Sequence, residues 1–103
     1  MSSQLVRLNV DCNVSHANDS AFHAAYNENF YPAIIQQTGF IECLLLKVTA
    51  DSKDLDPIHY RLDITFNSEA ERATWVAKDI HQDVWGKLSG TMKDFTVLHL
   101  TIN

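Results

Sequence analysis

His81 is the side chain of this sequence best placed to act as an acid or a base. It follows Asp79 and lies near the edge of the apolar stripe of an expected helix. The pKa of an unperturbed imidazole lies near neutrality, so His81 could serve as a general base toward a bound molecule. The other interpretation is a boundary histidine whose polar edge faces solvent. The residues alone leave both open.

Trp75 is the unusual residue of the same helix. At about 100° per residue it lies nearly opposite the apolar stripe, which consists of Ala73, Val76, Ala77, Ile80, Val84 and Leu88. Either the helix breaks near Lys78–Asp79, or Trp75 contacts a second chain. Aromatic side chains are favoured at interfaces, where they bury a large area at low entropic cost. The alternative role of Trp75 is to stack on a substrate.

Asn9, Tyr26 and Tyr60 are polar side chains that could face a cavity between helices and sheet. Each tyrosine falls at a core-facing position, so its hydroxyl needs a hydrogen-bond partner. Phe22 and Phe30, on the first helix, could form apolar walls of that cavity. The alternative is that the tyrosines belong to the core and are satisfied by backbone or water.

A group of charged side chains is expected on one face of the sheet. Arg61 and Asp63 are two residues apart on one strand and therefore point the same way. Buried charges need partners, and a cross-strand network with Arg7 and Asp11 would supply them. We therefore expect a protein interface there, with a polar substrate as the alternative. The predicted interface residues are Arg7, His59, Arg61, Asp63 and His99.

Composition indicates one globular domain, residues 1–103, with 46% hydrophobic and 20% charged residues. The net charge of −5, without clustered Lys and Arg, argues against nucleic acid as a partner. No apolar run is long enough to span a membrane, and the first residues do not resemble a signal peptide. We expect no membrane partner and a cytoplasmic location.

The sequence predicts no metal site and no cofactor. Cys12 and Cys43 lie in separate strand-like runs, and we expect buried thiols rather than a disulfide. Neither belongs to a Cys-x-x-Cys motif, and the glycine motifs that bind dinucleotides or phosphates are absent.

Hydrophobic periodicity predicts four strands and two helices. Strands are expected over 5–14, 41–49, 58–66 and 95–102, and helices over 19–38 and 68–89. Gly39 is expected to end the first helix, and Ser68 with Glu71 forms a capping box for the second. The order strand, helix, strand, strand, helix, strand is typical of the ferredoxin-like split βαβ fold, an α+β architecture with a four-stranded antiparallel sheet and two helices on one face.

The helix-free face of this sheet is expected to contact a second copy of the chain. Apolar residues accompany the charged ones on it, and contiguous exposed apolar surface usually marks an interface. Most soluble oligomers are two-fold homodimers. The apolar residues assigned to this face are Ile41, Cys43, Leu45, Phe95 and Val97.

The segment FHAAYNENFYPAIIQQTGF, residues 22–40, resembles part of the dimeric α+β barrel superfamily. Pro32 and the pair Gly39–Phe40 fall where that superfamily has them. Pro32 lacks the N–H that would bond to the carbonyl of Glu28, so it should kink the helix. Phe30 stands where many members have a histidine, and no role of that histidine is carried over.

The second helix, RATWVAKDIHQDVWGKL, resembles the antibiotic-biosynthesis-type monooxygenases. The resemblance implies a small aromatic substrate that O₂ attacks without a cofactor, in a cavity whose polar lining would be Asn9, Tyr26, Trp75 and His81. Haem-degrading members have a histidine ten residues after the tryptophan. This chain has Trp85 there, so we expect no haem.

Two kinds of function remain. The first is a cofactor-independent monooxygenase in which His81, Asn9 and Trp75 are catalytic and Tyr26, Phe30, Tyr60 and Phe22 line the pocket. The second is a homodimer that binds a small molecule without turnover or is purely structural, and the loss of the histidine at position 30 favours it.

Overall fold

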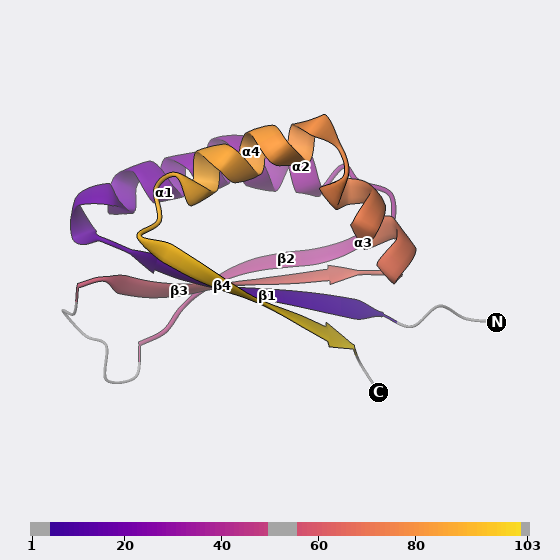
Figure 1. Ribbon diagram of the computed structural model, residues 1–103, viewed down its shortest axis with the longest axis horizontal. Helices are drawn as coiled ribbons and strands as arrows, with labels where there is room; N and C mark the ends of the chain where they lie inside the picture. Colours follow the sequence, from indigo (N-terminus) through magenta and orange to yellow (C-terminus); the bar gives the residue numbers. More distant parts are fainter. Residues whose placement is uncertain (1–4, 50–55, 102–103) are drawn as a thin grey trace.

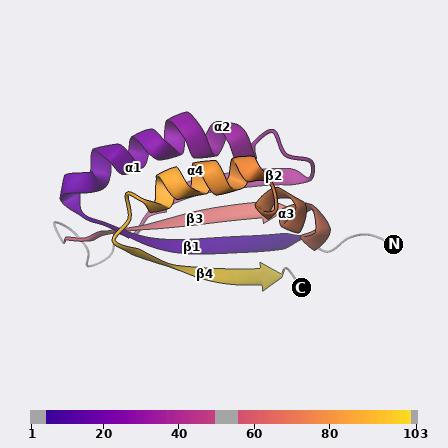
Figure 2. The same ribbon diagram turned by 45° about the horizontal axis from the view of Figure 1, so that its top comes forward.

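The computed structural model describes residues 5–49 and 56–101, and its strands form one antiparallel sheet. The order in the sheet is β2-β3-β1-β4, and the helices cover one face of it (Figures 1 and 2). The predicted ferredoxin-like α+β fold is therefore confirmed, with strand ends within two residues of those expected. The strands are β1 (Val6–Val14), β2 (Phe40–Lys47), β3 (Ile58–Phe66) and β4 (Asp94–Thr101).

The first helical segment is interrupted near Pro32, where the sequence predicts a kink. After a short 3₁₀ turn at His16–Asn18, α1 (Asp19–Ala25) continues into a π-helical turn, Tyr26–Phe30, and then into α2 (Tyr31–Ile34). Pro32 occupies the first turn of α2, so its missing N–H falls where the π turn joins α2. The helix changes from α to π over the turn that precedes the proline and returns to α at Tyr31.

The second helical segment is two helices, α3 (Glu69–Val76) and α4 (Asp79–Ser89), rather than one. Lys78 between them is extended, with φ −77° and ψ 147°. The break turns Trp75 inward, and only 3% of its surface is exposed. The first of the two predicted explanations for Trp75, a helix break near Lys78–Asp79, is confirmed.

The sequence predicts that Gly39 ends the first helix, but α2 ends at Ile34 and Gly39 lies in the turn that leads into β2. Its φ is +83°, a left-handed conformation that favours glycine. The predicted cap of α3 is confirmed, because the Ser68 hydroxyl accepts a hydrogen bond from the Glu71 backbone N–H at 3.3 Å. The Glu71 carboxylate in turn accepts from the Ser68 hydroxyl at 2.9 Å.

The strand register corrects the assignment of several residues to the helix-free face. In β4, Phe95, Val97 and His99 lie opposite Cys12, Val10 and Leu8, whose side chains point toward the helices. In β2, Cys43 and Leu45 likewise lie opposite core residues of β3. These five residues were predicted on the wrong face, because the alternation in β2 and β4 has apolar residues in both sets. The exposed leucines of the helix-free face are Leu44, Leu46, Leu98 and Leu100.

The core fills the space between the sheet and the helices. Both cysteines are buried free thiols, as predicted. Burial raises the pKa of the Cys43 thiol to about 11 and that of Cys12 to about 12, so neither is a ready nucleophile. The largest fully buried side chains are Phe22, Phe30, Ile34, Leu62, Phe66 and Leu88.

Candidate functional site

A pocket of about 190 Å³ lies between the helix-covered face of the sheet and the helices α3 and α4. Its floor comes from β1, β3 and β4, and its walls come from the helices and the π turn. The helix break after Val76 is what directs Trp75 and His81 toward the same space. The lining residues are Leu8, Val10, Phe30, Ile64, Phe66, Arg72, Trp75, Val76, His81, Trp85, Phe95, Val97 and His99.

Four aromatic rings surround this space at edge-to-face angles. The ring centroid of Phe30 lies 6.3 Å from that of Trp75 and 6.2 Å from that of Trp85. The Trp85 ring in turn lies 5.1 Å from that of Phe95. Aromatic walls of this kind suit a flat apolar or aromatic molecule, because both ring faces and ring edges are available for contact.

His81 is one of two histidines that line the pocket. Its ring lies 5.0 Å from that of Trp75, at 88° to it. Burial, and to a smaller extent the charge of Arg72, lowers the pKa of His81 from its ordinary value of 6.5. The imidazole is therefore neutral at physiological pH, the form in which it can accept a proton.

Arg72 provides a fixed positive charge at the same pocket. Its guanidinium donates to the Glu69 carboxylate from Nε at 2.9 Å and from Nη2 at 2.6 Å. These hydrogen bonds raise the pKa of Arg72 further above its usual range. The Arg72 side chain is only 15% exposed, whereas that of Glu69 is 61% exposed.

The structure brings together some of the predicted site residues and separates others. Trp75, His81 and Phe30 line one pocket, as expected. Asn9 does not, because it pairs with Asp63 and Leu98 on the opposite face of the sheet and donates a hydrogen bond to the Asp63 carboxylate at 3.0 Å. The expectation that Asn9 lines the same cavity as His81 is wrong.

The two predicted pocket tyrosines belong to the packed core and not to this pocket. The Tyr60 hydroxyl donates to Asp19 at 2.7 Å and lies 3.0 Å from Nε2 of His23. Its ring stacks on Phe22 at 4.9 Å between centroids. The Tyr26 hydroxyl lies 3.5 Å from the Cys43 sulfur. Both tyrosines are core residues, as the alternative interpretation held, but their hydroxyl partners are side chains rather than backbone or water. Phe22 packs with Tyr60.

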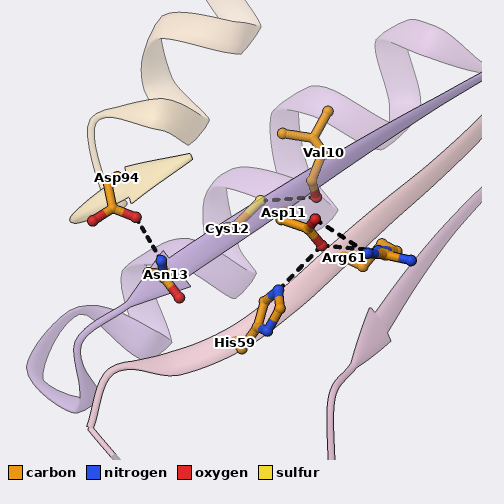
Figure 3. Close-up of polar contacts among 7 residues, drawn as sticks. All are labelled: Val10, Asp11, Cys12, Asn13, His59, Arg61 and Asp94. Atoms are coloured by element: carbon orange, nitrogen blue, oxygen red, sulfur yellow. Dashed lines mark hydrogen bonds and ion pairs between the residues drawn. The ribbon is translucent and has the colours of Figure 1, made fainter. Parts of the chain in front are cut away.

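The charged residues of the helix-free face form the predicted cross-strand network. Asp11 accepts hydrogen bonds from Nε of Arg61 at 2.8 Å and Nη2 at 3.1 Å, and its carboxylate lies 3.1 Å from Nε2 of His59 (Figure 3). Arg7 pairs in the same way with Asp63. His99 does not belong to this network, since it lines the pocket on the other face.

Sequence reasoning missed Arg72, Trp85 and Phe95 as pocket residues. Trp85 follows His81 by four residues, one helical turn, and this spacing could have placed both on one face of α4. Phe95 was assigned to the wrong face of β4. Arg72 had no signal of its own in the sequence.

Within residues 5–49 and 56–101, no group of three or more His, Cys, Asp or Glu side chains could hold a metal ion. No helix of this part of the chain is long and apolar enough to cross a membrane.

Comparison with known proteins establishes the fold. A candidate antibiotic biosynthesis monooxygenase from Caulobacter crescentus superposes with a TM-score of 0.80 at 12% identity, over 98% of this chain and 92% of that one. SnoaB, a cofactor-independent oxygenase from Streptomyces nogalater, gives a TM-score of 0.75 at 16% identity, over 98% and 93% of the two chains. The expected likeness to these proteins is confirmed at the level of the fold.

The same fold also occurs in a protein of different chemistry. The hydroxynitrile lyase of Passiflora edulis superposes with a TM-score of 0.70 at 17% identity, over 97% of this chain and 94% of the other. No protein-family model and no curated protein matches the sequence. The reaction must therefore be argued from the pocket, because one fold hosts many functions.

Proposed function

We propose that this chain, which shares its fold with a cofactor-independent oxygenase, binds a small aromatic molecule in the pocket beside His81 and oxygenates it. The single observation that carries the proposal is the position of a neutral imidazole among aromatic walls. The pocket is lined mainly by apolar side chains with a few polar ones, as small-molecule binding sites in proteins generally are.

A phenol illustrates the reaction that these residues support. His81 takes the phenol proton, and the resulting phenolate is electron-rich enough to be oxidised by O₂. One oxygen atom enters the ring as a carbonyl in place of a C–H bond, and the second leaves as water. Phenol and O₂ then balance with quinone and water, so no separate reductant is needed. Trp75 and Phe30 hold the ring, and the apolar lining limits water around it.

Oxygen consumption tests this proposal. We expect uptake above background with some member of a panel of phenols and hydroquinones, and a loss of about 10²-fold or more in His81→Ala, the contribution of a positioned general base. His16→Ala, an exposed histidine outside the pocket, is the matched control. Absence of uptake with every compound, or equal rates in His81→Ala, would contradict the oxygenase proposal.

A second candidate function is binding without turnover, and Phe30 favours it. An apolar ring occupies the position where the resembling families have a histidine, so the pocket has fewer groups for proton transfer than theirs. Ligand binding without oxygen uptake is the result that distinguishes this function from the first.

We also propose that the helix-free face contacts a second copy of the chain. The four exposed leucines of this face flank ion pairs that are already satisfied within one chain. Burying a satisfied pair costs less than burying a lone charge, so apolar contact with a partner is compatible with the charges present.

A further inference from the structure

We propose that the ligand of the pocket is an anion, a single aromatic ring bearing a carboxylate, and that Arg72 binds the carboxylate. This inference rests on the proposed function only in that the pocket takes an aromatic molecule. It adds the charge and the size of that molecule and names the residue that recognises it.

The charge of the pocket differs in sign from that of the whole chain. The protein has a net charge of −5, with 13 acidic residues against 8 basic ones. The ionisable side chains that line the pocket are nevertheless Arg72, His81 and His99, and no Asp or Glu lines it. Because His81 is neutral at physiological pH, Arg72 is the lining group with a fixed positive charge, and its mostly exposed partner Glu69 offsets that charge only in part. A cation at the pocket of an otherwise negative molecule favours an anion over a neutral or cationic ligand.

The geometry of Arg72 leaves part of its guanidinium available. Nε and Nη2 are engaged with Glu69, and Nη1 has no acceptor among the described residues. Because Glu69 is mostly exposed, solvent weakens its hold on the Arg72 charge. Glu69 occupies the edge of the guanidinium formed by Nε and Nη2. A ligand carboxylate could accept side by side from Nη1 and from the second N–H of Nη2, which form the other edge.

The volume sets the number of rings. An apolar cavity of about 150 Å³ holds benzene, and this pocket measures about 190 Å³. The space beyond one ring is enough for a small substituent. Because Trp75 forms a wall close to Arg72 in sequence and lines the same pocket, a ring on the aromatic walls and a carboxylate on Arg72 can be engaged together.

Three probes separate charge from ring in a calorimetric titration at neutral pH. Benzoate has both features, benzamide is its neutral counterpart, and cyclohexanecarboxylate keeps the charge without the aromatic ring. We expect benzoate to bind about 10-fold or more tightly than benzamide, because a charge-assisted hydrogen bond is stronger than a neutral one. Cyclohexanecarboxylate is expected to bind more weakly than benzoate.

Two variants assign the preference to a residue. Arg72→Gln should abolish the preference for benzoate while leaving benzamide binding unchanged, and Arg72→Lys should keep part of it. Lys87→Gln, which removes an exposed positive charge on α4 outside the pocket, is the matched control. The wild-type comparison of benzoate with benzamide needs no variant, so it stands even if Arg72→Gln does not fold.

The outcomes also separate this inference from the proposed function. Equal affinity for benzoate and benzamide, or a preference that persists in Arg72→Gln, overturns the role of Arg72 but leaves aromatic binding intact. Absence of binding by every probe overturns both.

Discussion

The protonation state of His81 governs what the pocket can do to a bound molecule. A protonated imidazole beside Arg72 would add a second positive charge, whereas the neutral form accepts a proton. Burial among aromatic side chains disfavours the charged form, and Arg72 acts in the same direction. The features that make His81 a competent base therefore also make it costly to protonate in the folded protein.

Stability should reflect this cost as the pH falls. The pKa of His81 is lower in the folded chain than its ordinary value of 6.5, so the unfolded chain binds more protons in that range. The free energy of unfolding should decrease as the pH falls below about 6.5. Chemical denaturation at pH 7.5, 6.5 and 5.5 tests this against His81→Gln, in which the decrease should be smaller. Parallel curves for the two proteins would show that His81 is not responsible.

At this scale the sequence predicted part of the site. His81 and Trp75 lie six residues apart in the predicted helix 68–89. The position of Trp75 opposite the apolar stripe indicated either a helix break or a contact with a second chain. Asn9 could not be excluded from the cavity without the sheet register, which puts it beside Asp63. The position of Arg72 at the pocket depends on tertiary contacts, which a single sequence does not reveal.

Among the secondary-structure elements, the turn before β2 and the start of α3 depend on each other. Gly39 approaches Glu71, the residue whose carboxylate and backbone N–H complete the cap with Ser68. The backbone N–H of Asn67 also donates to the Gly39 carbonyl at 2.7 Å. The turn before β2 and the start of α3 are thereby held together.

Gly39→Ala should destabilise the protein markedly. A Cβ at this position would lie 2.4 Å from Cδ of Glu71. The alanine would also have to adopt the left-handed φ of +83° that Gly39 has. Moving the Glu71 carboxylate breaks its hydrogen bond to Ser68, so we expect a loss of about 1–3 kcal/mol in the free energy of unfolding.

The control is Gly86→Ala in α4, where a Cβ meets nothing within 4 Å. This substitution should raise the free energy of unfolding by up to about 1 kcal/mol, because alanine is the better helix former. Urea denaturation of both variants makes the comparison, and a similar effect of the two would contradict a special role for Gly39.

Most elements of the fold were predictable because their patterns are local. The strand 58–66 alternates strictly and was found with the same limits in the structure. The faces of β2 and β4 were not, since apolar residues occupy both alternating sets and only pairing with β1 and β3 decides between them. The two-helix break at Lys78 was one of two interpretations that a single residue, Trp75, allowed.

For the whole molecule, the helix-free face sets the expected assembly state. Leu98 and Leu100 of β4 and Leu44 and Leu46 of β2 are each at least 40% exposed, and they lie on either side of the ion-pair network. Exposed leucines at both edges of this face are where a second copy could remove apolar area from water.

Substitution on this face should shift the chain toward the monomer. We expect light scattering to give about twice the 11.7 kDa chain mass at micromolar concentration, and Leu98→Glu to lower it toward one chain by placing a charge in the contact. Ile80→Glu is the matched control, since Ile80 is similarly exposed at 44% but lies on α4. A wild-type protein that is monomeric under these conditions would refute the proposed contact.

Strand β4 presents both surfaces at once. Phe95, Val97 and His99 project into the pocket, while Leu98 and Leu100, between and beyond them, project from the other side. If a second copy packs against Leu98 and Leu100 as proposed, self-association and ligand binding in the pocket would act on opposite sides of the same strand. Any effect of one on the equilibrium constant of the other would be reciprocal, changing both by the same factor. Ligand affinity would then be a function of protein concentration, and a titration carried out at a single dilution would report only one point on that curve.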